Sequence, residues 1–466
     1  MKNDKDKKQI SRRDFLKVMG AAGAAAAGMT ACGSGGGSSR QSANSEVPAG
    51  SMTYRDLTGD TVSLLGYGCM RWPMKPSADG KSETVDQERV NELVDYAIAH
   101  GVNYFDTSPL YCQGFSEEAT GIALDRHPRD KYFIATKLSN QRLYGSGLRG
   151  KALEEASIGM YRESFERLRT DYIDYYLFHI LGMGNGLEEM RGRVYDSGMA
   201  DFLMKEREAG RIRKLGFSFH GDVRVFDYML QESGIPWDFV QIQLNYSDWR
   251  HATGINVNAE YLYGELAKRR IPAVIMEPLL GGRLSKVHDH VVTKLKQREP
   301  DRSVASWAFR FAGSFPDVLT VLSGMTYMEH LQDNLRTYSP LQPLTQEEFA
   351  FLQETAELMA QYPTVPCNEC QYCMPCPYGI DIPGVLLHYN KCVNEGNILA
   401  SGRDTRYREA RRAFLVGYDR SVPKLRQANH CIGCNQCVSH CPQSIDIPAE
   451  LHRIDDYVES LKQETL

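Results

Sequence analysis

The sequence predicts an α/β protein: a parallel (β/α)8 TIM barrel followed by a smaller, mostly helical domain that is rich in cysteine. Between Thr53 and about Leu341, strand-like runs alternate with amphipathic helical segments, and eight such units imply a closed parallel barrel. The length of 466 residues suits a barrel plus an added domain. An open doubly wound sheet is the alternative, but no G-x-G-x-x-G follows the first strand-like run.

The N-terminus has the order of an export signal. A charged stretch containing Arg12 and Arg13 precedes a mildly apolar Ala/Gly run, Val18–Met29. That run is too short to span a bilayer, which needs about 20 residues. Paired arginines before such a run predict a signal of the twin-arginine type, the alternative being a disordered basic tail.

Met29-Thr30-Ala31-Cys32 resembles a bacterial lipobox, in which Cys32 would become the lipidated first residue of the mature protein. We therefore expect a signal at 1–31, a flexible linker at 32–52, the barrel at 53–341 and the cysteine-rich domain at 342–466.

A formal net charge of -5 without a long basic run argues against a nucleic-acid partner. After the signal, no stretch is apolar for long enough to span a membrane, so a lipid anchor at Cys32 is the expected membrane attachment.

The barrel strands are expected, in chain order, at 63–70, 102–108, 131–137, 173–179, 212–219, 238–246, 272–278 and 318–324. Helical spacing of apolar residues marks segments between them, such as 88–101 and 151–169. In a barrel of this kind, polar residues at the C-terminal ends of the strands face the active site.

Three successive strand ends carry polar residues of complementary chemistry. Asp106 ends the second strand, Tyr111 follows five residues later, and Lys137 and His179 end the next two strands. Singly, each could be a solvated end or a packed side chain. Together they describe an acid catalyst: a tyrosine has a pKa near 10, a lysine cation beside it lowers that value, and an aspartate holds the lysine. The histidine can orient or polarise a carbonyl.

From Thr53 to about Leu341 the chain resembles the aldo/keto reductase family, through "GYGCM", "FDTSPLYCQGFSEEATG", "GFSFHG", "QIQLNY", "EPLLGGRL" and "VLSGMTYMEHLQDN". The resemblance implies that Asp106, Tyr111, Lys137 and His179 form the catalytic tetrad, with Tyr111 as the general acid. It also implies NADH or NADPH bound across the barrel mouth without a glycine-rich fingerprint. The positions that correspond to nicotinamide carboxamide and adenine contacts are Ser218, Gln241 and Asn334.

Some positions depart from the family pattern. Met276 stands where an aromatic residue commonly stacks on the nicotinamide, and Phe219 stands where an asparagine often binds the carboxamide. Gly324, Met325 and His330 occupy positions where many NADPH-preferring members place lysine, serine and arginine. The sequence therefore leaves the choice of nicotinamide nucleotide open.

Eight cysteines form two runs, each ending in a related phrase, "CPYGIDIP" or "CPQSIDIP". The runs are Cys367, Cys370, Cys373, Cys376 and Cys431, Cys434, Cys437, Cys441. Disulfides and a zinc site are alternatives. The second run has the C-x2-C-x2-C-x3-C-P spacing of bacterial ferredoxins, which predicts [4Fe–4S] clusters. The first run has two residues before its last cysteine, so Cys376 departs from the pattern.

The repeat resembles two-cluster ferredoxin modules, in which the fourth cysteine of each run ligates the other cluster. We expect Cys441 to join the first three cysteines of the first run, and Cys376 to join those of the second. The two "IDIP" phrases are expected to be matching strands or turns. The longer insert, Tyr378–His430, is expected to be helical around Val385–Asn390 and Thr405–Phe414.

Taken together, the chain resembles an iron–sulfur-containing branch of the aldo/keto reductases, exported already folded by the twin-arginine route. This resemblance implies a cell-envelope oxidoreductase that acts on a small carbonyl or alcohol substrate, with two [4Fe–4S] clusters and an unidentified redox partner. Clusters pass single electrons whereas a nicotinamide transfers a hydride, so the sequence leaves their connection open. The alternative is an accessory electron-transfer protein whose barrel is a scaffold.

Overall fold

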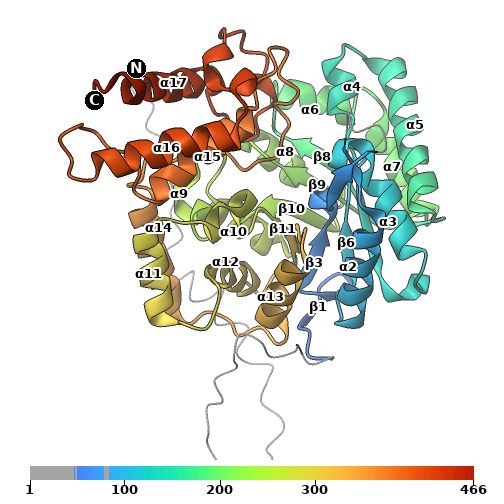
Figure 1. The fold of residues 1–466 in the computed structure, drawn as a ribbon. Helices are drawn as coiled ribbons and strands as arrows, with labels where there is room; N and C mark the ends of the chain where they lie inside the picture. Colours follow the sequence, from blue (N-terminus) through green and yellow to red (C-terminus); the bar gives the residue numbers. More distant parts are fainter. Residues whose placement is uncertain (1–46, 48–49, 78–82) are drawn as a thin grey trace, which may run out of the picture. The chain divides into compact units, whose positions relative to one another are not determined.

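The computed structural model describes residues 47, 50–77 and 83–466 (Figure 1). The predicted signal and Cys32 lie outside these residues. The chain divides into two compact units. The barrel unit consists of the chain up to Asn245 with Val257–Pro278 and Phe309–Thr345, and the cysteine unit consists of Tyr246–Asn256, Leu279–Ala308 and Gln346–Leu466. In the described part of the chain, no helix combines the length and apolar character needed to cross a membrane.

Eight parallel strands close the predicted barrel, in the order β3-β6-β7-β8-β9-β10-β11-β12 and back to β3. The strands are β3 (Leu65–Gly68), β6 (Tyr104–Asp106), β7 (Phe133–Leu138), β8 (Ile173–Leu181), β9 (Ile212–Phe219), β10 (Phe239–Gln243), β11 (Ala273–Met276) and β12 (Val318–Ser323). The predicted fold class is thus confirmed.

Helices alternate with these strands along the chain, as the apolar spacing predicted. They are α2 (Gln87–Ala99), α3 (Ser116–Leu124), α5 (Gly150–Leu168), α7 (Met199–Glu208), α8 (Val223–Gln231), α10 (Ala259–Arg269), α12 (Val304–Gly313) and α13 (Met328–Tyr338). Further elements lie in the connections: η2 (Cys69–Arg71), η3 (Tyr111–Gly114), η4 (Arg129–Lys131), α4 (Gln141–Gly145), α6 (Leu187–Val194), α9 (Asp248–His251), η5 (Leu280–Ser285) and α11 (Asp289–Arg298).

Two strand boundaries differ from the prediction in ways that affect the site. The first strand was expected to continue to Met70, but β3 ends at Gly68 and the chain turns into η2. The fourth was expected to end at His179, but β8 continues to Leu181 across a register shift between Phe178 and Leu181. His179 therefore lies within an irregular strand end.

An antiparallel hairpin precedes the barrel strands. Strand β1 (Tyr54–Asp56) pairs with β2 (Thr61–Ser63), and a second hairpin pairs β4 (Met74–Pro76) with β5 (Glu83–Val85). The turn of the first hairpin contacts the barrel, because the hydroxyl of Thr58 lies 2.8 Å from that of Tyr175.

A buried apolar cluster fills the adjoining interior: Val62, Tyr104, Ala135, Tyr175, Leu177, Phe239, Val274, Leu319 and Leu322. The barrel is therefore a packed core and not a pore.

The cysteine unit is mostly helical. It contains α9, α11, α14 (Gln346–Met359), α15 (Ile382–Asn394), α16 (Tyr407–Ser421), α17 (Ile447–Gln463) and the short turns η6 (Lys424–Arg426), η7 (Ala428–His430) and η8 (Val438–His440). A second buried core joins α15, α16 and α17. The helices expected around Val385–Asn390 and Thr405–Phe414 are present as the longer α15 and α16.

The two "IDIP" phrases are neither strands nor turns, and that expectation was wrong. Each begins a helix: the carboxylate of Asp381 accepts from the backbone N–H of Gly384, and that of Asp446 accepts from Ala449. An aspartate at the N-cap with proline in the first turn is a strong helix start. The sequence repeat is therefore also a structural repeat, a cysteine run followed by a capped helix.

Candidate active site and cysteine groups

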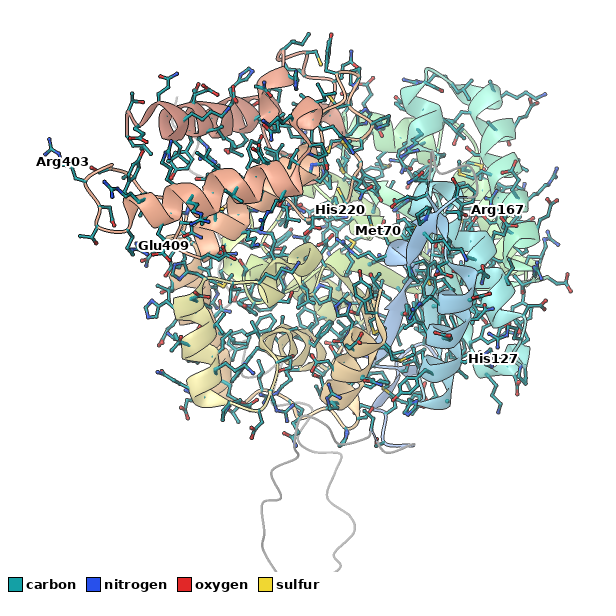
Figure 2. All side chains as sticks on the ribbon, viewed as in Figure 1. Met70, His127, Arg167, His220, Arg403 and Glu409 are labelled. Atoms are coloured by element: carbon teal, nitrogen blue, oxygen red, sulfur yellow. The ribbon has the colours of Figure 1, made fainter. Side chains whose placement is uncertain are left out.

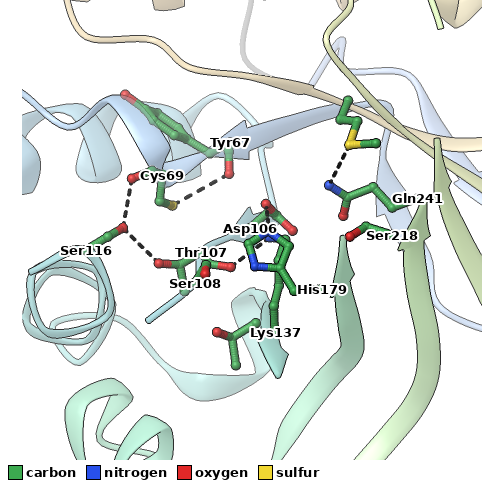
Figure 3. A network of polar contacts seen from close by, with 12 residues as sticks. Tyr67, Cys69, Asp106, Thr107, Ser108, Ser116, Lys137, His179, Ser218 and Gln241 are labelled. Carbon is green, nitrogen blue, oxygen red and sulfur yellow. Dashed lines mark hydrogen bonds and ion pairs between the residues drawn. The ribbon is translucent and has the colours of Figure 1, made fainter. Parts of the chain in front are cut away.

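A buried ion pair lies where β6 and β7 end (Figure 3). The Nζ of Lys137 donates to Oδ1 of Asp106 at 2.5 Å and to the carbonyl oxygen of Thr107 at 2.8 Å. Burial lowers the pKa of Lys137 and raises that of Asp106, and each partner opposes the shift of the other. The close contact of the two buried charges holds the ammonium group in one position.

Tyr111 lies against this ammonium group. It begins η3 and is buried, and its ring centre is 4.9 Å from the Nζ of Lys137. The ring of His179 meets it edge to face, at 5.9 Å between centroids. The next two residues, Cys112 and Gln113, have left-handed backbone angles, with φ of 49° and 58°. Such angles are uncommon outside glycine and concentrate at functional sites.

His179 is held as a neutral imidazole. Its Nδ1 lies 2.6 Å from the hydroxyl of Ser139, which in turn lies 3.0 Å from the hydroxyl of Ser108. Burial keeps the pKa of His179 well below its usual value, and the neighbouring Lys137 and Arg193 cations lower it further. A neutral imidazole that accepts from the Ser139 hydroxyl at Nδ1 can donate one hydrogen bond from Nε2.

The backbone that carries His179 is strained and buttressed. The next residue, Ile180, has a φ of 54°, which is a genuine outlier for a β-branched side chain. Arg193 of α6 donates to the carbonyl oxygens of both His179 and Ile180, at 2.5 and 3.2 Å. The N–H of Ile180 donates to the hydroxyl of Ser218 at 2.8 Å. Three polar contacts therefore fix the bulge that sets the direction of the imidazole.

Ser218 and Gln241 lie opposite each other in the register of β9 and β10. The Nε2 of Gln241 lies 3.6 Å from the sulfur of Met276, and its buried Oε1 has no hydrogen-bond partner among the described residues. A buried amide oxygen left without a donor is costly, so it suits a ligand that supplies an N–H. Asn334 is separate from this pair: it is buried on α13 and donates to Ser323 at the end of β12.

The cysteine runs interleave. Burial, and to a smaller extent the nearby Cys441, raise the pKa of the Cys367 thiol to about 11. Burial, and to a smaller extent Cys367 and Cys441, likewise raise the pKa of the Cys373 thiol to about 12. The last cysteine of the second run thus lies beside the first run.

The converse holds for Cys437, a member of the second run. Burial, and to a smaller extent Cys431, Cys434 and Cys376, raise the pKa of its thiol to about 11. We call Cys367, Cys370, Cys373 and Cys441 the first cysteine group, and Cys431, Cys434, Cys437 and Cys376 the second cysteine group. The sulfurs are thiols without a disulfide bond. Within the described residues, no three His, Cys, Asp or Glu side chains converge on a position for a single metal ion.

The structure brings four of the predicted site residues together, namely Asp106, Tyr111, Lys137 and His179. Sequence reasoning missed Ser139 and Arg193, which hold His179. Ser139 lies two residues after Lys137, so its place just beyond a strand end was a usable signal. Arg193 had none, because an arginine in "EEMRGRV" resembles any solvated helix residue.

Models of three protein families match the chain. The aldo/keto reductase family matches residues 64–357, a 4Fe-4S dicluster domain matches 366–445, and a twin-arginine translocation pathway signal sequence matches 9–28. Among curated proteins, an uncharacterised oxidoreductase of Bacillus subtilis, YqkF, is 24% identical over 308 residues, which covers 63% of this chain and 92% of that protein. The L-galactose dehydrogenase of Arabidopsis thaliana is 24% identical over 307 residues, covering 62% and 89%.

Solved structures show the same fold. An aldo-keto reductase from Bacillus halodurans in its holo form is 24% identical with a TM-score of 0.50, covering 65% of this chain and 96% of that one. An aldo-keto reductase from Klebsiella pneumoniae in complex with NADPH is 22% identical with a TM-score of 0.50, covering 68% and 98%. The family match spans well over half of the sequence. The chain therefore belongs to the aldo/keto reductase family and carries a C-terminal 4Fe-4S dicluster domain and a twin-arginine signal sequence.

Proposed function

We propose that this oxidoreductase interconverts a carbonyl group and the corresponding alcohol at the barrel mouth, with Tyr111 as the acid–base group. The observation that carries the proposal is the buried Lys137–Asp106 pair set beneath the tyrosine ring, 4.9 Å from its centre. A barrel that served only as a scaffold would gain nothing from a buried cation at that position, because burying an ion pair costs solvation energy.

Each residue of this group has a separate task. Tyr111 gives a proton to the carbonyl oxygen, or takes one from the alcohol. Lys137 stabilises the phenolate that this leaves, because a nearby cation favours the charged form of an acid. Asp106 fixes the lysine at 2.5 Å. His179, neutral and held by Ser139, donates a hydrogen bond that orients the carbonyl oxygen.

The mouth also suits a nicotinamide nucleotide, NADH or NADPH. The unpartnered Oε1 of Gln241 can accept from a carboxamide N–H, and the Ser218 hydroxyl can donate to a carboxamide oxygen. A bound nicotinamide would supply or accept the hydride of the reaction. The Klebsiella pneumoniae relative of known structure contains NADPH, which supports the same class of cofactor here. Asn334, bonded to Ser323, is proposed to lie on the adenine side.

The two cysteine groups would each hold one [4Fe–4S] cluster. The second run has the ferredoxin spacing and the first departs from it only before Cys376, and the electrostatic neighbours of Cys367, Cys373 and Cys437 support crossed ligation of two clusters. Bound clusters would supply one-electron steps. With a twin-arginine signal at 9–28, we place this chemistry in the cell envelope, with Cys32 as a lipid anchor.

The test uses the full-length protein purified without oxygen, with its iron and sulfide counted. NADH and NADPH oxidation is followed with a panel of aldehydes and ketones, and the reverse reaction with alcohols. The proposal expects turnover that Tyr111→Phe lowers by about 10² to 10⁴. Absence of any nucleotide-dependent turnover in protein with full iron content would favour the accessory electron-transfer alternative.

A further inference from the structure

The two cysteine groups have opposite surroundings, although the sequence around them repeats. Within the repeat, Asn368 corresponds to Ile432, since each follows the first cysteine of its run. Asn368 is 3% exposed, whereas Ile432 is 62% exposed. Tyr378 and Gln443 also correspond, because each follows the proline after the last cysteine. Gln443 is 3% exposed, whereas Tyr378 is 47% exposed.

The first cysteine group is covered by the connections that follow β10 and β11, both of which belong to the cysteine unit. Gly281, with a φ of 65°, passes so close to Asn368 that an added Cβ would lie 2.1 Å from its carbonyl oxygen. Arg283 donates to the Thr364 hydroxyl at 3.3 Å and acts electrostatically on Cys367. These contacts bury one side of the group.

The connection after β10 covers the other side. An added Cβ at Gly254 would lie 2.6 Å from the carbonyl oxygen of Gln443, and the side-chain amide of Asn256 donates to Oε1 of Gln443 at 3.0 Å. Both covering connections leave the C-terminal ends of barrel strands, the ends that carry the candidate active-site residues. The segments that cover the first cysteine group are therefore continuous in sequence with two barrel strands.

At the second cysteine group, the corresponding positions, Ile432 and Tyr378, carry exposed apolar side chains. A third exposed apolar side chain, Leu425, lies on the short turn η6 and is 81% exposed. Two hydrogen bonds tie its short turn η6 to the group: the ring nitrogen of His430 contacts the carbonyl oxygen of Lys424 at 3.1 Å, and the carbonyl oxygen of Arg426 accepts from the N–H of Asp381.

This surface is basic at its edge. Arg420, Lys424 and Arg426 are exposed, and within the described residues no carboxylate forms an ion pair with any of the three. The carboxylates nearby are occupied: Asp419 accepts from Gln427, and Asp381 caps α15. An apolar centre with unpaired cations at its rim fits a partner whose own docking surface is acidic.

We propose that Leu425, Ile432 and Tyr378, with Lys424 and Arg426 at their edge, form the docking surface for an acidic one-electron carrier protein. The second cysteine group, whose repeat positions are exposed, is thus the end of the electron path that meets the carrier. This rests on the proposed role of the clusters. In each exchange the reduced carrier loses one electron and the second group's cluster gains it, without proton transfer.

The test measures binding and reduction with flavodoxin, an acidic one-electron carrier, as the probe. Calorimetry gives its affinity for the full-length, iron-loaded protein, and stopped-flow absorbance gives the rate of cluster reduction by reduced flavodoxin. Methyl viologen, a small dication, is the comparison reductant. Lys424→Glu with Arg426→Glu is expected to weaken binding and slow reduction by flavodoxin on the order of tenfold or more, with a reduced dependence on salt. Reduction by methyl viologen is not expected to slow.

The matched control is Arg403→Glu, an exposed arginine that Figure 2 labels beyond the other end of α16. The helix has 15 residues and is therefore roughly 22 Å long. The control thus reverses the charge of an exposed arginine at a distance from the proposed docking surface. Ile432→Glu tests the apolar centre. If its iron content falls, the charge-reversal pair, which replaces no cysteine, decides the question.

The proposal would be overturned if neither the charge-reversal pair nor Ile432→Glu changed the binding of flavodoxin and the rate of cluster reduction. An equal loss in the Arg403→Glu control would also overturn it, as would a concentration-dependent dimer abolished by Ile432→Glu, which would assign the surface to a second copy of the chain. If neither flavodoxin nor methyl viologen reduces the wild-type clusters, the cluster role in the proposed function fails instead. The two failures are therefore distinguishable.

Discussion

Arg193 donates a 2.5 Å hydrogen bond from Nη2 to the carbonyl oxygen of His179, although its side chain is only 1% exposed. A buried guanidinium needs several acceptors, and this one also reaches Ile180, Asn140 and Glu189. The carbonyl oxygens of His179 and Ile180, which both accept from Arg193, belong to the strained bulge. We infer that Arg193 positions the imidazole by stabilising a backbone that Ile180 alone would not adopt.

Arg193→Met is therefore expected to lower kcat by about 10²-fold, because a displaced catalytic group loses the geometry of reaction. The effect on KM for the nucleotide should be smaller. Steady-state kinetics measures both. Arg129→Met is the matched control, because Arg129 pairs with Asp174 at the other end of the same strand. It should lower the melting temperature and spare kcat; an equal fall of kcat in both variants would contradict a positioning role for Arg193.

Sequence reasoning was strongest where chemistry coincides with regular structure. Asp106 and Lys137 stand at the ends of apolar runs, and a parallel barrel necessarily brings such ends together. It was weakest where structure departs from regularity. The bulge at Ile180 has no local signal, since isoleucine favours extended backbone. Nor could the chain order reveal that Gly281 packs on Asn368, because that contact joins residues far apart in the sequence.

Tyr111→Phe is expected to lower turnover by about 10² to 10⁴ while the fold persists, because the ring and its contact with Lys137 remain. Turnover is measured with the best carbonyl substrate of the panel. Tyr175→Phe is the control: its hydroxyl bonds Thr58 and Asp60 near the first hairpin, so stability and not turnover should change. Wild-type turnover in Tyr111→Phe would remove the proposed acid.

Lys137→Met is expected to abolish activity and to destabilise the protein by about 3–5 kcal/mol at neutral pH, because it leaves Asp106 buried without its cation. Burial already raises the pKa of Asp106, and loss of the lysine raises it further. A carboxyl with a raised folded-state pKa loses stability as pH rises, because the unfolded state ionises first. The destabilisation should therefore shrink as pH falls through the folded-state pKa of Asp106.

Denaturant unfolding of Lys137→Met and wild type at several pH values measures this trend. The double variant Lys137→Met with Asp106→Asn removes the stranded charge, so it should regain stability at neutral pH without regaining activity. A destabilisation that stays constant with pH would mean that Asp106 is not the cause.

Export is expected to depend on the paired arginines, in accord with the twin-arginine signal matched at 9–28. Arg12→Lys with Arg13→Lys should retain the protein, folded and iron-loaded, in the cytoplasm. Cell fractionation with iron analysis measures this. The control, Lys7→Gln with Lys8→Gln, removes nearby charge and should leave export unchanged. Envelope localisation of the double-arginine variant would contradict the dependence.

Cys441→Ala tests which cysteines hold which cluster. Cys441 belongs to the second run but lies electrostatically beside Cys367 and Cys373 of the first. On the crossed arrangement, the substitution should damage the cluster of the first cysteine group and spare the other, so that about half of the iron is lost. Iron counting and low-temperature electron spin resonance of the reduced protein measure the loss, and the identity of the lost cluster follows from a companion variant in the first run, Cys373→Ala.

On the crossed arrangement the two variants should lose the same cluster and leave the same residual spectrum, whereas clusters held by single runs would give two different residual spectra. Cys392→Ala is the control, because this buried thiol on α15 belongs to neither run and should leave both clusters intact. Spectra that assign the lost cluster to the variant's own run would mean that each run holds its own iron. The interleaved thiols would then reflect the packing of two self-contained sites, and Cys376, with its shortened spacing, would be a ligand of the first.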